Sequence, residues 1–539
     1  MRYTCLLLMV SLAAVFGQEK PAQDKTAPGK PAAERSSRES PRPEKAPEEQ
    51  ATRSEKAREL LESASKLVPS VQPQVQVAAL LHLGDNFNLV DRKKAIECLE
   101  RAFASASELP SGPEDPRGDM QARVVESMAD VDLAKALEML PQLAAPTGGD
   151  PRLMAIQKVV RLLLDKKDLD RAIEVVESVG STGEYPFHAA RLIFEKLPED
   201  DGRRAQVFSA ASAAFAVRPR GPFAEFLSKH WQAVSRPVAE AALQAVLNSI
   251  LDKKEEGSNT TNLSTAKGMV SFRTQQDRQL FDLIHVMREL DSKRAASLLE
   301  ARPELRAAVD RFPTGMASMG GDNISMSVMQ GDKPDQQAQG REQLQALARS
   351  RAAEALSVMK EDPQKALSLV RGIPVPALQA QVLGSVARTV SDKDPSTAKS
   401  VLDQSLKILD EIKEPRERLR VWSIVAEAAH RAKENLRAWE AIDRGLSDAA
   451  ALYKRDADVE SPNQALREFW PSTQSYRAMM HRAASLFGAE AEPLLAKITD
   501  PELALLARIE IAQALLDRPL SVRESRFSSG GRGEVNRFR

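Results

Sequence analysis

The stretch DLDRAIEVV, residues 168–176, has five further copies along the chain. In every copy an Asp is followed four residues later by Ala and eight residues later by Leu or Val. The other copies are DRKKAIECL from Asp91, DLAKALEML from Asp132, DSKRAASLL from Asp291, DPQKALSLV from Asp362 and DPSTAKSVL from Asp394. A pattern that returns in this way indicates one structural unit used many times.

The repeated Asp is a signal for the start of a helix. An Asp side chain caps the free N–H groups of a first helical turn, and Pro363 and Pro395 follow two of the copies at the first helical position, where a missing N–H costs nothing. Residues four apart in a helix are neighbours, so the Ala and the Leu or Val lie on one face. Each copy therefore predicts a helix that begins after its Asp and buries that face.

A second amphipathic run precedes most copies, for example VAALLHLGDNFNLV before Asp91 and LMAIQKVVRLLLDKK before Asp168. The unit is thus a helix, a short turn and an Asp-capped helix, and it returns about every 32 to 41 residues. Such a pair cannot bury its apolar side alone and stacks on its neighbours. The sequence predicts an all-α fold, an α-solenoid of stacked antiparallel helix pairs.

The units resemble tetratricopeptide repeats. The residues that carry the resemblance are Leu80, Leu83, Gly84 and Phe87 in a first helix and Ala95, Leu99 and Ala102 in a second helix. The spacing between the two sets is one residue short of that family's usual pattern, and HEAT-like packing is the alternative. The resemblance implies a concave surface that binds a protein or a peptide.

We expect the N-terminal residues to direct export. Residues 1–17 carry Arg2 and then an apolar run, which is typical of a signal peptide and shorter than the ~20 residues that span a bilayer. If the signal is not cleaved, the chain would instead be anchored in the membrane at its N-terminus. Cleavage would remove Cys5 and leave Cys98 as the single cysteine, so we expect no internal disulfide. We expect Cys98 itself to be a small buried thiol within a helix.

The rest of the sequence divides by composition. Residues 18–53 lack large apolar side chains and predict a disordered Pro/Lys/Glu-rich linker, and residues 519–539 predict a disordered basic tail. Residues 54–312 predict an N-terminal helical-repeat lobe and residues 341–518 a C-terminal one. A flexible Met- and Gly-rich insertion, residues 313–340, is expected between the lobes.

The insertion holds two Met-x-x-Met pairs, Met316 with Met319 and Met326 with Met329. Thioethers are soft ligands that suit Cu(I), so these four residues are candidate copper ligands. The alternative is an apolar, Met-bearing loop that docks on the helices or on a partner. A second interruption, residues 253–268, is polar and predicts a loop.

The sequence carries no motif that indicates catalysis or a cofactor. The six histidines include no pair four residues apart, and phosphate-binding loops, dinucleotide fingerprints and serine-hydrolase elbows are absent. ESRF, residues 524–527, resembles the start of the catalytic motif of lytic transglycosylases, but too few residues follow to build a domain around Glu524. With 76 basic and 76 acidic residues and no basic block, nucleic acid is a poor candidate partner.

These observations predict a non-enzymatic scaffold, exported to the periplasm or secreted, that binds a protein or peptide on its concave face. The tryptophans at positions 231, 422, 439 and 470 are predicted core anchors, with a role of one or two as binding hot spots as the alternative. Two other functions stay open: a cell-envelope enzyme, for example a cell-wall-active one with its site on the concave face, and copper binding by the Met loop. The oligomeric state does not follow from the sequence.

Overall fold

The computed structural model describes residues 47–109, 117–143, 152–180, 184–219, 222–252, 260–265, 268–319, 325–329, 336–458 and 471–520. Within this part, Arg53–Leu520 form one compact unit. The predicted signal peptide, most of the predicted linker and nearly all of the predicted tail lie outside the described residues.

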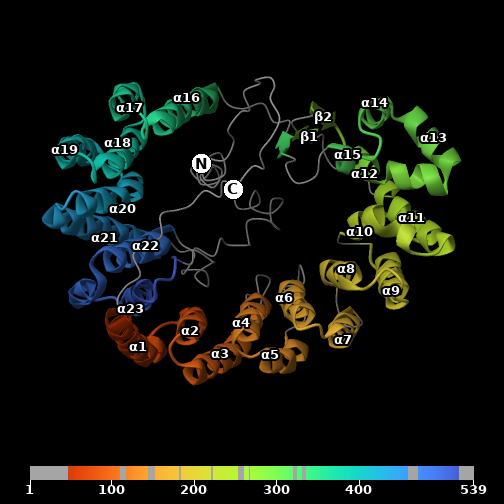
Figure 1. Cartoon of the computed structure of the whole chain (residues 1–539), viewed down its shortest axis with the longest axis horizontal. Coiled ribbons are helices and arrows are strands. Elements are labelled where there is room, and N and C mark those ends of the chain that lie inside the picture. Colours follow the sequence, from red (N-terminus) through yellow and green to blue (C-terminus); the bar gives the residue numbers. More distant parts are fainter. Residues whose placement is uncertain are drawn as a thin grey trace, which may run out of the picture. The chain divides into compact units, whose positions relative to one another are not determined.

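The described chain is almost entirely helical, which confirms the predicted fold class (Figure 1). Helices with even numbers form one layer, called the even layer here, because each contacts the next from α2 to α14 and again from α16 to α22. The even layer consists of α2 (Pro73–Phe87), α4 (Arg117–Val131), α6 (Arg152–Asp165), α8 (Phe187–Lys196), α10 (Phe223–His230), α12 (Gln275–Leu290), α14 (Pro303–Arg311), α16 (Gln336–Val358), α18 (Pro376–Val390), α20 (Pro415–Arg431) and α22 (Pro471–Phe487).

The remaining helices alternate with the even layer along the chain. They are α1 (Pro47–Leu67), α3 (Arg92–Ser107), α5 (Leu133–Met139), α7 (Leu169–Gly180), α9 (Arg203–Val217), α11 (Arg236–Leu251), α13 (Ser292–Ala301), the single turn α15 (Met316–Met319), α17 (Pro363–Val370), α19 (Pro395–Glu411), α21 (Asn435–Asp458) and α23 (Pro501–Leu515). Consecutive helices such as α2 and α3, or α20 and α21, pack against each other. This is the arrangement expected of stacked helix pairs.

All six recurring Asp residues stand at the start of a helix, as the pattern predicts. Each side chain accepts a hydrogen bond of 2.9 to 3.3 Å from a main-chain N–H of the first turn. The donors are the N–H groups of Lys94, Lys135, Arg171, Arg294, Lys365 and Thr397. The Ala and the Leu or Val of every copy are buried. The predicted helix starts and buried faces are therefore confirmed.

A close approach between α2 and α3 explains the Gly at position 84. A Cβ atom built on Gly84 would lie 2.6 Å from Cγ of Leu99, which is closer than real contacts allow. The other residues of the tetratricopeptide-like match are also buried, namely Leu80, Leu83, Phe87, Ala95 and Ala102. The match thus consists of residues at the packing surface between two helices of one pair.

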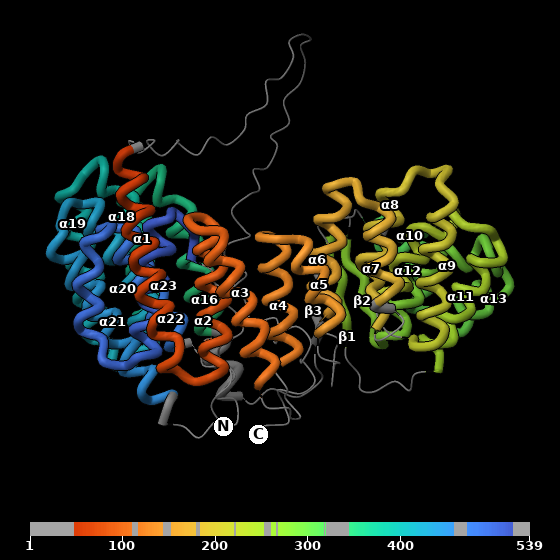
Figure 2. The backbone as a smooth tube through the Cα atoms, turned by 90° about the horizontal axis from the view of Figure 1, so that it is seen from below, coloured from red at the N-terminus to blue at the C-terminus, as the bar shows by residue number. Residues whose placement is uncertain are grey.

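The last helix of the chain packs against the first pair. α23 contacts α2, and Figures 1 and 2 show α23 beside α1 and α2. Nη2 of Arg53 donates to the carbonyl oxygen of Ala514 at 3.3 Å, and Nζ of Lys56 lies 2.9 Å from Oε2 of Glu492. This contact, called the seam here, joins α1 and α2 to α23 and to the 3₁₀ segment η6 (Gly488–Lys497). The division of the helical region into two lobes at residues 313–340 stays a prediction.

A small antiparallel sheet interrupts the helices, and the prediction of a loop over residues 253–268 is wrong for its last part. The strands are β1 (Thr260–Thr265), β2 (Gly268–Phe272) and β3 (Ser325–Met329), in the order β2-β1-β3. Leu263, Val270 and Phe272 are buried while Ser264, Met269 and Ser271 are exposed. This alternation is the period of a strand with one buried face, which the polar composition of the segment conceals.

Two helices begin earlier than expected. α1 begins at Pro47, before the predicted boundary at Ser54, and α16 begins at Gln336, within the predicted insertion. Proline suits the first position of a helix, and Glu48 and Glu49 lie in the first turn of α1, where the helix dipole favours negative charge. A proline at the first position and acidic residues in the first turn can thus favour a helix start where the sequence has no large apolar side chain.

Candidate functional site

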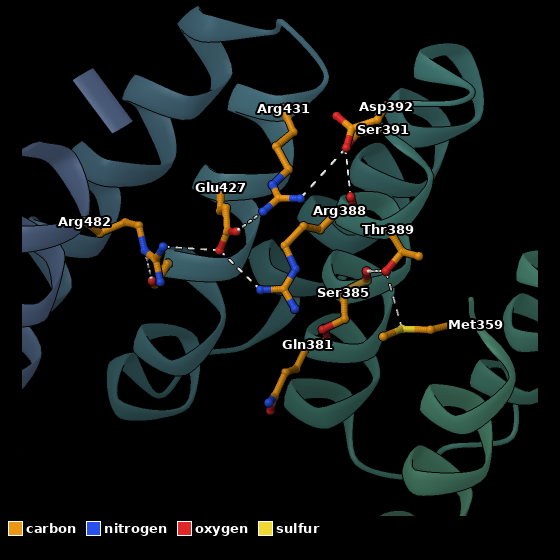
Figure 3. Close-up of polar contacts among 11 residues, drawn as sticks. Met359, Gln381, Ser385, Arg388, Thr389, Ser391, Asp392, Glu427, Arg431 and Arg482 are labelled. Atoms are coloured by element: carbon orange, nitrogen blue, oxygen red, sulfur yellow. Dashed lines mark hydrogen bonds and ion pairs between the residues drawn. The ribbon is translucent and has the colours of Figure 1, made fainter. Parts of the chain in front are cut away.

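Three arginines from successive helices of the even layer surround one glutamate (Figure 3). Oε2 of Glu427 on α20 accepts a hydrogen bond from Nη1 of Arg388 on α18 at 3.2 Å. The same oxygen lies 3.2 Å from Nη1 of Arg482 on α22. Oε1 of Glu427 accepts from Nη2 of Arg431 at 3.1 Å. These four residues are called the arginine cluster.

The packing of α18 and α20 positions the cluster. A Cβ atom built on Gly384 of α18 would lie 3.0 Å from Cγ2 of Ile424 of α20, so the two helices approach closely where Gly has no side chain. Val386 and Val425 are buried. Because the apolar sides face the core, Glu427 and its arginines occupy the partly exposed sides of their helices.

The cluster carries more positive than negative charge. Side-chain exposure is 12% for Glu427 but 35%, 36% and 48% for Arg388, Arg482 and Arg431. The second nearby carboxylate belongs to Asp392, which lies 4.0 Å from Arg431 and is 71% exposed, so water screens its charge. One largely buried carboxylate is therefore shared by three arginines that remain in contact with solvent.

An equivalent group of charges on α8 and α10 is balanced. Nη1 of Arg191 lies 2.6 Å from Oε1 of Glu225, and Nε of Arg191 lies 3.6 Å from Oε1 of Glu195. Nζ of Lys229 lies 2.9 Å from the same oxygen of Glu225. Two cations here meet two carboxylates, so the surplus of positive charge is a property of the arginine cluster and not of every ion pair in the even layer.

An ion pair between α22 and α23 is closed to solvent. Nε of Arg477 on α22 donates to Oε1 of Glu510 on α23 at 2.6 Å, and the two side chains are only 2% and 0% exposed. Nη2 of Arg477 and Oε2 of Glu510 are buried and have no hydrogen-bond partner among the described residues. The pair connects α22 to α23 and cannot contact a partner.

The predicted methionines lie on α15 and β3. Met316 is held on α12, because its N–H donates to Oδ1 of Asp282 at 3.2 Å and its sulfur accepts from Nη2 of Arg278 at 3.6 Å. Burial raises the pKa of Asp282. Met319 is 1% exposed, and the Cα atoms of Met326 and Met329 pair with Leu263 and Thr260 of β1. A guanidinium beside the Met316 sulfur disfavours a second cation there, so the described side chains add no support to copper binding.

The described residues contain no group of three or more His, Cys, Asp or Glu side chains arranged to hold a metal ion. Cys98 is buried as predicted, and burial raises the pKa of its thiol to about 11. This environment keeps the sulfur protonated and unreactive.

The tryptophans differ in their burial. Trp422 is a core anchor as predicted: it is 2% exposed, and its Nε1 donates to Oδ2 of Asp448 at 2.8 Å. Trp439 is half-buried and stacks on Phe487 with ring centroids 4.1 Å apart, and Trp231 is half-buried as well. Trp470 lies outside the described residues.

No sequence pattern predicted the arginine cluster. Only Glu427 and Arg431 stand at a spacing that places them side by side on one helix, whereas Arg388 lies 39 residues before Glu427. A useful signal is the repeat length itself, since residues about one repeat apart occupy matching positions on neighbouring helices. Charged residues separated by about one repeat are therefore candidates for contacts between neighbouring helices.

Among the described residues, no helix combines the length and the apolar character that crossing a bilayer requires. No family model matches the chain, and no curated protein is similar to it in sequence.

Proposed function

We propose that this protein is a non-enzymatic scaffold that binds a protein partner along the even layer. The single observation that carries the proposal is that successive helices of this layer contact one another, from α2 to α14 and from α16 to α22, and so place side chains of several repeats on one surface. Stacked helix pairs use such extended surfaces to bind proteins and peptides. The arginine cluster lies on this layer and spans three of its helices.

Two finer statements belong to the same proposal. The helix pairs are tetratricopeptide-like, supported by the close contact of Gly84 with Leu99 between α2 and α3. The chain is exported, supported by the apolar run of residues 1–17, and its partner is then a protein of the cell envelope or of the exterior. With equal numbers of basic and acidic residues, a protein partner is favoured over nucleic acid.

Site-specific photo-crosslinking in cells tests the proposal. A photoreactive residue replaces Arg420, which is exposed on α20 of the even layer, or Lys407, which is exposed on α19 outside it. We expect a discrete crosslinked protein from position 420 and none from position 407. Crosslinking from position 407 alone, or from neither position in a folded and abundant protein, would contradict binding along the even layer.

A further inference from the structure

The arginines of the cluster have many hydrogen-bond donors that the fold does not use. A guanidinium carries five N–H donors in a planar fork. Arg388 makes one contact through Nη1, and Arg482 makes two, to Glu427 and from Nε to Oγ of Ser423 at 3.0 Å. Arg431 contacts Glu427 and, more distantly, Asp392. Most N–H groups of these three side chains thus have no partner in the described part of the chain.

Glu427 fixes the arrangement of these donors. Its carboxylate is largely buried and accepts from three directions, so it holds the guanidinium groups of α18, α20 and α22 next to one another. Side chains held in place before binding lose less conformational entropy when a ligand arrives. The partly exposed guanidinium groups are therefore preorganised to receive further carboxylates.

The positive surface continues along α20. Arg420 stands seven residues before Glu427, which is two helical turns on the same face, and it is exposed. It has no charged or hydrogen-bonding partner among the described residues. Arg420 thus adds a positive charge on the same face of α20, two turns before the three arginines that surround Glu427. A compact site of this kind, on a chain with no net charge, attracts a short anionic segment rather than a long polyanion.

We propose that the arginine cluster binds an acidic segment of a protein partner, with two or more Asp or Glu side chains seated on Arg388, Arg431 and Arg482. The planar fork of each guanidinium matches a carboxylate and forms charge-assisted hydrogen bonds. This inference rests on the proposed scaffold function and specifies where the partner binds and through which chemical groups.

Fluorescence anisotropy with the full chain tests the inference. The probe is a labelled hexaglutamate peptide, and hexaglutamine is its uncharged counterpart. We expect the protein to bind hexaglutamate and not hexaglutamine, with affinity that falls as salt is raised. The variants Arg388→Gln, Arg431→Gln and Arg482→Gln should each weaken binding about tenfold, the size expected for loss of hydrogen bonds to a charged group.

Arg191→Gln is the matched control, because Arg191 also pairs with glutamates on the even layer but belongs to a balanced group. It should leave the affinity unchanged. Thermal unfolding of each variant verifies the fold, and Arg431, the most exposed of the three, gives the variant least able to disturb packing.

Three results would overturn the inference: equal affinity for the two peptides, equal losses in the Arg191 and Arg482 variants, or tighter binding of inorganic phosphate than of hexaglutamate at the same residues. The scaffold function is tested separately. If the crosslinked partner from position 420 persists when Arg388, Arg431 and Arg482 are all changed to Gln, the partner binds the even layer through other groups, and only the acidic segment is disproved.

Discussion

Nη2 of Arg53, in the first described helix, donates a hydrogen bond to the carbonyl oxygen of Ala514 in the last one. The contact is one of a group. Nε of Arg508 donates to Oγ of Ser63 at 3.2 Å, and Nη1 of Arg518 donates to the carbonyl oxygen of Asp85 at 2.6 Å. Polar contacts across the seam thus join α23 to α1, and the residues that follow α23 to α2, while apolar side chains of the same helices share one core.

The seam should hold the two parts of the chain together without a covalent link. If a protease site is inserted between Met329 and Gln336 and then cut in the folded protein, we expect both pieces to elute together, because buried apolar side chains of α1 and α23, such as Leu61 and Leu515, belong to one core. Size-exclusion chromatography measures this. Separation of the pieces under native conditions would show that the seam is too weak to join them.

Gly84→Ala should destabilise the protein by about 1–3 kcal/mol, the usual cost of overpacking, although Ala is the better helix former. The new methyl group would meet Leu99 at 2.6 Å. Chemical denaturation measures the free energy of unfolding. Gly202→Ala is the control, because no atom lies within 4 Å of the added Cβ, and it should change stability little. Equal effects of the two changes would refute the close-packing explanation.

Asp91→Ala should reduce the free energy of unfolding by about 1 kcal/mol, since it removes the cap of α3. Asp91→Asn keeps an oxygen that can accept from the N–H of Lys94 and should recover most of the loss. Urea denaturation measures the free energies of unfolding of the two variants. A large loss in the Asn variant as well would assign the effect to charge rather than to capping.

Arg477→Met should cost about 3–5 kcal/mol, because the buried Glu510 carboxylate would lose its partner. The double variant Arg477→Met/Glu510→Leu should be far less harmful, within about 1 kcal/mol of the original protein, because no buried charge remains. The free energies of unfolding of both variants decide the matter. If the double variant is as unstable as the single one, the pair stabilises the fold by more than the neutralisation of one buried charge by the other.

Cys98 should resist alkylation in the folded protein at pH 8 and react after unfolding. Burial raises the pKa of its thiol from 9.0 to about 11, so almost no thiolate forms. Since the unfolded chain loses this proton first, the contribution to stability is complete below about pH 9 and is lost as the pH rises towards 11. Maleimide labelling of the Cys5→Ser chain measures the first effect. Rapid labelling of the native protein would place Cys98 at the surface.

The helices and their buried sides could be predicted because their signals are local. The cap at Asp394 accepts from the N–H of Thr397, three residues away, and Ala398 and Leu402 follow on the same face. The small sheet could not be predicted from the sequence, for the opposite reason. Thr261 on β1 pairs with Val328 on β3, and no local pattern indicates which distant strand completes a sheet.

The repeated Asp phrase and the amphipathic run before it therefore establish that this chain forms capped, amphipathic helices in stacked pairs, because each cap and each buried face depends on residues within two or three turns. Packing between distant segments establishes the rest: α23 lies against α2, and Arg388, Arg431 and Arg482 meet around Glu427. The arginines come together only after the helices stack in one register. That register is set by the burial of many apolar side chains and not by any single charged residue.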